Sequence, residues 1–235
     1  MKIKSEKSHA RLDQSSRHTK AKKIISVLQK FIDLKECNVL DIGTGSGNII
    51  ADIAKHCKSA ISVDMHDERQ VKTGYTFKKV DNEKLPFKDN TFDAAISNHV
   101  FEHVPNQTLH LAEIHRVLKK HGILYLATPN KLWPLDPHYK LPFITWLPRK
   151  VSNAYLQAVK GKDWDIYSRT YYHLKKMAKG KFMIHNATLD IIKNPQKYNL
   201  EIYKGLQPIV SMMPRIVLRL LNPIVPTYIL ILRKI

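Results

Sequence analysis

The sequence of 235 residues contains few cysteines and no long hydrophobic segment. Cys37 and Cys57 do not form a CxxC pair, so we expect two reduced thiols and no need for a disulfide or a structural metal. Residues 220–232 form a long uncharged run, but 13 residues with two prolines are too few for a membrane span, which needs about 20. The first thirty residues lack the apolar core of a signal peptide. These absences favour a cytoplasmic protein. Residues that could still give peripheral membrane contact are Met212, Met213, Arg215 and Arg219.

Negative charge is scarce, and positive charge is unevenly distributed. The formal net charge is +19, from 39 Lys and Arg against 20 Asp and Glu. Residues 1–36 carry an excess of 6 positive charges and residues 131–235 an excess of 13, while residues 37–130 are balanced. We expect these flanks to meet an anionic partner, such as a phosphorylated or carboxylated substrate, nucleic acid or a membrane surface. Solvated lysine-rich helix faces are the alternative explanation.

The middle of the sequence alternates apolar runs with segments of helical periodicity, which is typical of a parallel sheet covered by helices on both faces. The expected strands are residues 38–42, 60–65, 75–80, 92–97, 122–128, 200–203 and 227–232. The expected helices are residues 21–33, 48–56, 67–72, 107–120 and 171–178. The sequence therefore predicts a doubly wound α/β fold.

Three alternating glycines follow the first expected strand, in the string Val39-Leu40-Asp41-Ile42-Gly43-Thr44-Gly45-Ser46-Gly47-Asn48. Glycines permit the backbone dihedrals of such a turn and let a ligand approach closely. Asn48 stands where a dinucleotide fingerprint has its third glycine, and no Lys-Ser/Thr pair follows as in a P-loop. Both phosphate-binding motifs are therefore excluded. Asp41, just before the glycines, favours a cationic ligand group such as an ammonium.

Two further acids stand at the ends of the next two expected strands. Asp64 lies 21 residues after Gly43, where a carboxylate can accept hydrogen bonds from both ribose hydroxyls. Asp81 ends the third strand and could accept an adenine amino group. Because the carboxyl ends of parallel strands meet at one sheet edge, Asp41, Asp64 and Asp81 together predict a pocket for a nucleoside that carries a positive charge.

Residues 37–130 resemble a class I S-adenosylmethionine-dependent methyltransferase, of the broad group that includes the quinone-biosynthesis enzymes. The resemblance depends on the glycine string, Asp64, residues 81–87, the Phe92-Asp93-Ala94 strand and residues 124–130. It implies S-adenosylmethionine as cofactor and a Rossmann-like, seven-stranded sheet, mostly parallel, whose last strand is antiparallel. The implied cofactor contacts are Asp41, Gly43, Thr44, Gly45, Gly47, Asp64, Met65, Asp81, Asn82, Glu83, Asn98 and His99. A Rossmann-like fold that has lost its ligand is the alternative.

The string Asn98-His99-Val100-Phe101-Glu102-His103 follows the fourth strand and, in the family, lines the methionine end of the cofactor. By their spacing, His99, Glu102 and His103 would share one helical face. Some relatives have Glu-x-x-Glu-His here and hold a divalent metal on it, whereas this chain has His99 in place of the first Glu. A general base, a metal site and hydrogen-bonded structural histidines all stay open. We take His99 and His103 as catalytic candidates and assign no metal ligand.

Five prolines and several large aromatic residues are concentrated in residues 129–148. Proline excludes a helix or a central strand there, so we expect an ordered loop that covers a pocket. A fainter resemblance, over residues 127–149, is to methyltransferases of bacterial cell-surface glycan and glycolipid assembly. It implies that Asp136 and His138 are catalytic, acceptor-side residues. The residues implied to contact an anionic sugar or lipid carrier are Lys140, Arg149 and Lys150. A lid held by its own packing is the alternative.

The sequence therefore predicts one domain with four parts. These are a basic N-terminal helical cap (1–36), a cofactor-binding core (37–130), an acceptor-covering insertion (131–185) and the C-terminal part of the sheet (186–235). The expected reaction is methyl transfer to oxygen of a small or glycan/lipid-linked, anionic acceptor. Two alternatives remain. One is an RNA-directed methyltransferase that uses the basic flanks, although no RNA-binding module is recognisable. The other is a non-catalytic cofactor-binding protein.

Overall fold

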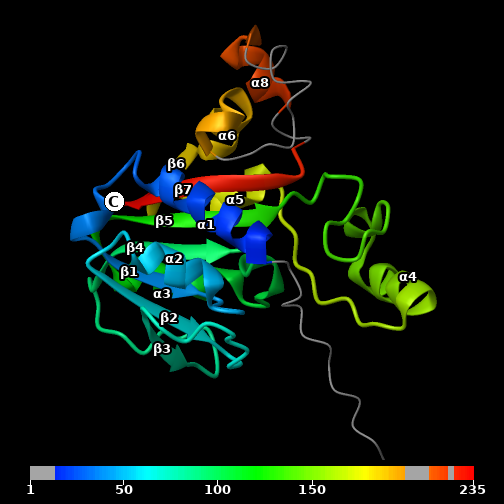
Figure 1. Cartoon of the computed structure of the whole chain (residues 1–235). Coiled ribbons are helices and arrows are strands. Elements are labelled where there is room, and N and C mark those ends of the chain that lie inside the picture. The colour runs from blue at the N-terminus through cyan, green and yellow to red at the C-terminus, as the bar shows by residue number, and fades with distance from the viewer. Residues whose placement is uncertain (1–13, 199–211, 222–224) are drawn as a thin grey trace, which may run out of the picture.

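The computed structural model describes residues 14–198, 212–221 and 225–235, built around a seven-stranded sheet of order β3-β2-β1-β4-β5-β7-β6 (Figure 1). The strands are β1 (Asn38–Ile42), β2 (Ser59–Asp64), β3 (Thr76–Lys79), β4 (Phe92–Asn98), β5 (Leu118–Pro129), β6 (Phe182–Asn186) and β7 (Thr227–Lys234). The first five strands are parallel, and β7 runs antiparallel to both β5 and β6. This confirms the predicted Rossmann-like sheet with an antiparallel last strand.

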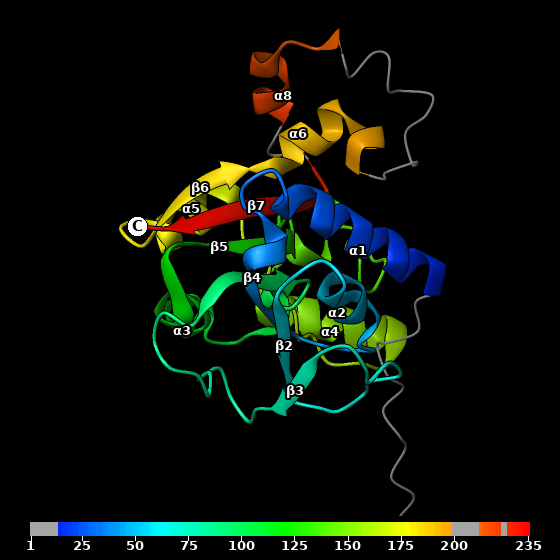
Figure 2. The same ribbon diagram turned by 60° about the vertical axis from the view of Figure 1, so that its left-hand side comes forward.

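Helices cover both faces of the sheet (Figure 2). On one face, α1 (Gln14–Leu28), α2 (Asn48–Ala54) and α6 (Ala187–Lys193) pack their apolar side chains into one buried cluster. On the other face, α3 (Gln107–Val117) and α5 (Tyr171–Ala178) do the same. In α3 the buried Leu111, Ile114 and Val117 recur every three residues, which directs one stripe of the helix at the sheet. The side chain of Asn106 caps this helix by accepting the backbone N–H of Leu109.

The chain leaves the sheet after β5 and forms a small lobe before it returns at α5. The lobe contains the 3₁₀-helix η3 (Ile144–Trp146) and α4 (Arg149–Lys160), and it lies beyond the carboxyl ends of the parallel strands (Figure 1). It has an apolar core of its own. The residues of this core are Tyr139, Leu141, Ile144, Leu156, Trp164 and Ile166. The lobe is therefore packed as a separate unit over the end of the sheet where ligands bind in such folds.

Three short 3₁₀-helices and one short helix are the remaining elements of the residues that the structure describes. The 3₁₀-helices are η1 (Leu34–Glu36), η2 (Phe101–His103) and η4 (Pro195–Tyr198), and the last helix is α8 (Arg215–Leu221). Within the ranges that the structure describes, no helix combines the length and apolar character needed to cross a bilayer.

The helix expected at residues 67–72 is wrong. The backbone N–H groups of Gln70 and Val71 donate to the carbonyl of Ser46 in the glycine turn, instead of closing a helical turn of their own. Asp67 accepts both the backbone N–H and the guanidinium of Arg69, a side-chain to backbone pattern that competes with helix. This segment is therefore an irregular cover on the glycine turn.

Other elements differ from the expected boundaries. Helix α1 covers residues 14–28 rather than 21–33, and β5 begins at Leu118, inside the expected helix 107–120. Strand β6 and helices α4 and α6 were not expected. The expected strand at residues 200–203 lies outside the described residues. β6 has only five residues, and its alternate side chains are exposed, so its signal in the sequence is weak.

Candidate active site

The strand order reverses between β1 and β4, and a cavity of about 600 Å³ opens at this switch point. Segments from α1, the glycine turn, the end of β4 and the insertion surround it. Its lining residues are Arg17, Lys20, Asp41, Gly43, Thr44, Gly45, Ile49, Asn98, His99, His103, Pro137, His138, Tyr139, Lys140, Lys160 and Lys162. The volume is that of a site for a small molecule or a cofactor.

The glycine turn is closely packed on its outer side. Gly43 has a φ of 84°, and a Cβ placed on it would lie 2.2 Å from Cγ2 of Val100. Gly47 has a φ of 80°, and its Cβ would meet the carbonyl oxygen of Val71 at 2.2 Å. Both positions thus need glycine for conformation and for space. Gly47 serves the packing of the turn and does not line the cavity, unlike Gly43 and Gly45.

Asp41 lies on β1 with its side chain almost wholly buried at the cavity. Burial, and secondarily the negative charge of Asp64, raise the pKa of Asp41 to about 8. The hydroxyl of Thr44, also on the cavity wall, is buried and has no hydrogen-bond partner within the described part of the chain. A buried carboxylate and an unpartnered hydroxyl fit a polar ligand group with a positive charge.

Asp64 ends β2 as expected, and its carboxylate accepts the backbone N–H groups of Gly45 and His66. It holds the glycine turn in place through these hydrogen bonds and does not line the cavity.

Met65 is exposed. Asp81 and Asn82 follow β3 on the surface, and Asn82 accepts the N–H of Lys84. The structure therefore places the three predicted acids after or near the ends of three consecutive strands, with only Asp41 on the cavity wall. Glu83 also lies outside the wall.

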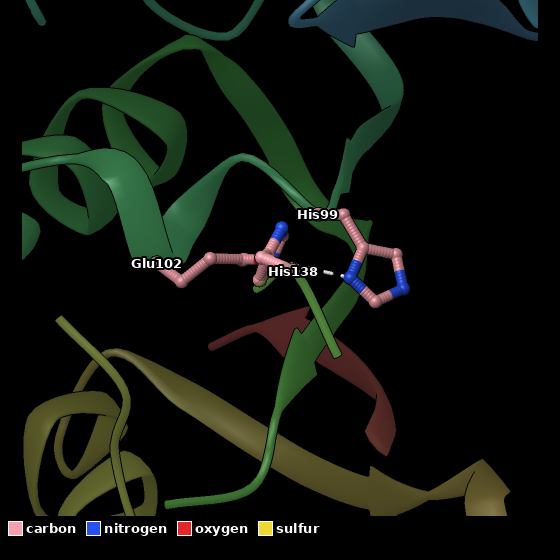
Figure 3. A group of neighbouring side chains, drawn as sticks. All are labelled: His99, Glu102 and His138. Carbon is pink, nitrogen blue, oxygen red and sulfur yellow. Dashed lines mark hydrogen bonds and ion pairs between the residues drawn. The ribbon is translucent and has the colours of Figure 1, made fainter. Parts of the chain in front are cut away.

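Glu102 is completely buried and accepts hydrogen bonds from two histidines (Figure 3). Its Oε1 atom is 3.1 Å from Nδ1 of His99 and 3.2 Å from Nε2 of His138, and its Oε2 atom accepts the hydroxyl of Thr128. Despite burial, these hydrogen bonds from His138 and His99 lower the pKa of Glu102 to about 2. Because the carboxylate is ionised, each imidazole carries its proton on the nitrogen that faces Glu102. The Nε2 atom of His99 points away from Glu102 (Figure 3).

His99 has a φ of 59°, in the left-handed region that few non-glycine residues adopt. The backbone there is fixed by the hydrogen bond from the N–H of His99 to the carbonyl of Ala127 on β5. Only Phe101–His103 forms a turn of 3₁₀-helix, so the predicted common helical face of residues 99, 102 and 103 is wrong. His138 occupies the place beside Glu102 that was expected for His103.

His103 instead pairs with the insertion. Its Nδ1 atom is 3.1 Å from Oδ2 of Asp165, whose other oxygen accepts the hydroxyl of Tyr139. Burial alone would lower the pKa of His103, but the hydrogen bond to Asp165 outweighs it and the pKa is raised. The ring also lies 5.0 Å from that of His138, edge to face. Three histidines thus line one side of the cavity, each oriented by a carboxylate.

Asp136, expected as an acceptor-side residue, is buried and organises a turn. Its Oδ2 atom accepts the backbone N–H groups of His138 and Tyr139, and its own N–H donates to the carbonyl of Leu141. It does not line the cavity. Asp136 therefore acts by holding the backbone on which His138 reaches Glu102.

Four basic residues of the cavity were missed by the sequence analysis. Arg17 and Lys20 are one helical turn apart on α1, and burial together with the charge of Arg17 lowers the pKa of Lys20. Lys160 and Lys162 come from the end of α4. The i, i+3 spacing of the first pair could have indicated a common face. Lys140 lines the cavity as expected, whereas Arg149 lies elsewhere and Lys150 is exposed outside it.

The same histidines could also hold a metal ion. Ligand atoms of His99, Glu102 and His138 lie within 4.8 Å of one another, and two imidazoles with one carboxylate form a donor set suited to transition metals. The two imidazole–carboxylate hydrogen bonds satisfy the buried carboxylate without an ion. The cluster is thus complete as a hydrogen-bonded unit.

The open α/β sheet, the glycine turn at the switch point and the buried acid beside it define a Rossmann-like nucleotide-binding domain. Residues 40–126 match the family described as "Methyltransferase domain". Residues 40–126 are therefore similar to a methyltransferase domain, in agreement with the resemblance of residues 37–130 to class I S-adenosylmethionine-dependent methyltransferases.

Curated relatives support this assignment over the same region. A ubiquinone/menaquinone biosynthesis C-methyltransferase from Citrifermentans bemidjiense is 31% identical over 134 residues, which cover 50% of this chain and 56% of that protein. A sterol 4-C-methyltransferase from Caenorhabditis elegans is 32% identical over 146 residues, covering 54% of this chain and 43% of that protein. The chain thus spans about half the length of the curated relatives it matches.

Solved structures share the fold over nearly the whole chain. An S-adenosylmethionine-dependent methyltransferase from Mesorhizobium loti matches with a TM-score of 0.58 at 16% identity, covering 90% of this chain and 97% of that one. The [4+2]-cyclase SpnF matches with a TM-score of 0.55 at 16% identity, covering 98% of this chain and 84% of that one. Since a cyclase shares the architecture, the reaction has to be argued from the residues of the site.

Proposed function

We propose that this protein transfers the methyl group of S-adenosylmethionine to an oxygen atom of an anionic acceptor. The observation on which the proposal depends is that one cavity joins the glycine turn and Asp41 to three carboxylate-oriented histidines. When bound, the cofactor supplies a methyl group on a positively charged sulfonium. The protein then has to hold the acceptor in line with that methyl group and accept a proton.

The cavity wall provides opposite charges for the two ends of an amino acid. Asp41 can bind the ammonium group of the methionine part, and Arg17, whose Nη1 lies near the glycine turn, can bind its carboxylate. Asp64 would take the ribose hydroxyls beside the N–H of Gly45. The adenine contacts assigned to Asp81, Asn82 and Glu83 follow β3 on the same sheet edge.

His99 is the proposed general base. Its Nδ1–H donates to the buried Glu102, which fixes the ring and leaves Nε2 to accept the proton of the acceptor hydroxyl. His99 would accept the proton of the acceptor hydroxyl during transfer of the methyl group, and the electron pair of the broken carbon–sulfur bond would remain on the sulfur of the departing cofactor product. His103, oriented by Asp165, is the second candidate. Comparing His99→Gln with His103→Gln at saturating cofactor assigns the role, since the base variant loses turnover and not cofactor affinity.

Transfer to oxygen distinguishes this proposal from the relatives, whose names give C-methylation. Its support is the set of imidazoles on the cavity wall, because an acceptor hydroxyl has a proton to lose during transfer. Product analysis decides the point. Release of labelled methanol by alkaline hydrolysis identifies a methyl ester, and release of labelled iodomethane by hot hydriodic acid identifies a methyl ether; either result supports the proposal. A label that stays on carbon under both treatments contradicts it.

The acceptor is proposed to be anionic, as a small molecule or a group linked to a glycan or lipid. Lys140, Lys160 and Lys162 line the cavity from the insertion, and none of them forms an ion pair within the described ranges. Incubation with radiolabelled cofactor and fractionated cell extract shows whether the label enters glycan, lipid, small molecule or RNA. RNA labelling with a steep loss of affinity in salt would favour the RNA-directed alternative. Cofactor binding without any labelled product would favour a non-catalytic binding protein.

Peripheral membrane contact is proposed for the region of α8. Met212, Ile216 and Leu220 expose 84%, 62% and 73% of their surface, a density of exposed apolar side chains that is unusual on a helix. Sedimentation with anionic vesicles tests this. Binding lost on Ile216→Ser with Leu220→Ser supports it, and binding unaffected by that double change contradicts it.

A further inference from the structure

A second, smaller cavity lies on the insertion lobe. It has a volume of about 200 Å³ and is built from the start of α4 and from the segment that returns to α5. Its lining residues are Lys131, Thr145, Leu147, Arg149, Trp164, Ile166, Tyr167, Ser168 and Arg169. Tyr139 of the first cavity and Trp164 of the second are in ring contact at 5.7 Å, so the apolar core of the lobe stands between the two.

The charge of this cavity is one-sided. Lys131, Arg149 and Arg169 bring three positive charges to its wall, and no lining residue is an acid. Within the described ranges none of the three has a carboxylate partner. Clustered cations repel one another, and the cluster is stabilised when an anion enters it.

Arg149 is held in a fixed orientation. Its guanidinium donates to the carbonyls of Trp164 at 2.8 Å and of Ile166 at 3.4 Å, and it stacks on the ring of Tyr167 at 4.1 Å. A guanidinium fixed in this way binds an oxyanion with little further loss of side-chain freedom. Two of its five N–H groups are used in these bonds, which leaves donors for a ligand.

Ser168 supplies a second, independent observation. This residue lines the cavity, and its hydroxyl oxygen is buried and has no hydrogen-bond partner within the residues that the structure describes. Buried polar atoms in proteins are nearly always paired, so an orphaned one indicates a missing partner. Helix α4, which begins at Arg149, adds the partial positive charge of its first turn, where no acidic side chain or side-chain cap is present.

We propose that this cavity is a binding site for a phosphate-type oxyanion, held by Lys131, Arg149, Arg169 and the hydroxyl of Ser168. The anion is either the phosphate group of an extended acceptor or a separate phosphorylated molecule. Binding of the anion can be tested separately from methyl transfer, since the cavity shares no lining residue with the first one.

The site is joined to the catalytic loop through the same returning segment. The backbone N–H of Tyr167 donates to the carbonyl of Glu102 at 2.7 Å, and the side chain of Gln107 donates to the carbonyl of Tyr167. Arg169 donates to the side chain of Gln107. An anion that orders residues 165–169 therefore also steadies the loop of Glu102 and His103.

Calorimetric titration of the full chain with inorganic phosphate, at an ionic strength held constant with sodium chloride, tests the site. We expect saturable binding of one phosphate, weakened roughly tenfold by Lys131→Gln and by Arg149→Lys, and less by Ser168→Ala. Lys150→Gln, on the exposed side of the same helical turn, is the matched control and should bind as the unmodified protein does. Melting temperatures show that each variant is folded.

No saturable heat, or equal weakening by Lys150→Gln and Lys131→Gln, would overturn the site, because either result means that charge acts without a defined cavity. Acetate in place of phosphate is expected to bind more weakly, since it offers fewer oxygens.

The source of the anion is found by adding phosphate to the labelling reaction. If added phosphate lowers labelling of the acceptor, the anion bound at this site is a phosphate group of the acceptor. If labelling is unchanged or increases, the anion is a separate phosphorylated molecule. If the protein binds phosphate but does not bind S-adenosylmethionine, the proposed function is contradicted and the oxyanion site is not.

Discussion

His138, which belongs to the insertion, hydrogen-bonds the buried carboxylate of Glu102 in the connection from β4 to α3. The same Oε1 atom accepts Nδ1–H of His99, so a residue of the insertion and a residue of the core share one acceptor. This cluster of two histidines and one carboxylate is therefore completed only when the insertion is in place. Charge on Glu102 keeps both rings in the required tautomer.

Glu102→Gln should lower turnover by about 100-fold or more, because an amide cannot act as an ionised acceptor for two imidazole donors. Cofactor affinity is expected to change little, since Glu102 does not line the cavity. Single-turnover rates and cofactor titration measure the two quantities separately. Glu36→Gln, on the exposed η1 turn, is the control. An unchanged turnover rate in Glu102→Gln would contradict the proposal that His99 acts as a base oriented by Glu102.

Cofactor affinity should rise with pH between about 6 and 8. Asp41 has its pKa raised to about 8 by burial and by Asp64, so below that pH the free protein holds it protonated. A cationic ligand group favours the ionised form of Asp41, and binding therefore releases a proton. The affinity for the cofactor then rises by up to about tenfold per pH unit. Calorimetry in buffers of different ionisation enthalpy counts the protons. Asp41→Asn should bind weakly and without this pH dependence, and an unchanged slope would remove Asp41 from the ammonium contact.

Asp64→Ala should abolish measurable cofactor binding while the fold persists. The change removes the carboxylate that is proposed to accept hydrogen bonds from the ribose. It also removes the acceptor for the backbone N–H of Gly45, so that hydrogen bonds to a charged group are lost on both sides. Calorimetry with the cofactor product, and circular dichroism for folding, give the result. Unaltered affinity would contradict the ribose assignment.

Gly43→Ala should destabilise the protein by about 2 kcal/mol or more, because the new Cβ would lie 2.2 Å from Val100 and φ is positive. Gly161→Ala is the matched comparison. Its φ of 62° imposes strain, but nothing lies within 4 Å of its Cβ, so its cost should be near 1 kcal/mol. Adding Val100→Ala to Gly43→Ala should recover part of the stability in urea titrations. An equal loss of stability in Gly43→Ala and Gly161→Ala would show that the loss comes from the positive φ and not from the contact with Val100.

Chelators should leave the transfer rate unchanged if His99 acts as a base on a hydrogen-bonded Glu102. The measurement is turnover after dialysis against EDTA and after addition of Mn²⁺ or Zn²⁺. A rate that disappears with EDTA and returns with metal would mean that His99, Glu102 and His138 act as ligands.

The sheet and the donor side of the site could be predicted because their signals are local. Gly43, Gly45 and Asp41 stand within five residues of one another, and strand alternation is visible in a short window. The acceptor side could not be predicted in the same way. The contact of His138 with Glu102 spans 36 residues of chain, and it depends on a turn held by Asp136. Helical spacing alone favoured His103, which the structure turns toward Asp165 instead.

The insertion leaves and rejoins the core at one point, since Asn130 and Arg169 are paired and the N–H of Lys131 donates to the carbonyl of Arg169. A segment with its ends side by side can be lengthened, shortened or exchanged without moving any strand of the sheet. Under the proposed function, a new lobe grafted at this junction would change the methyl acceptor, while the half of the molecule that holds the glycine turn would stay as it is.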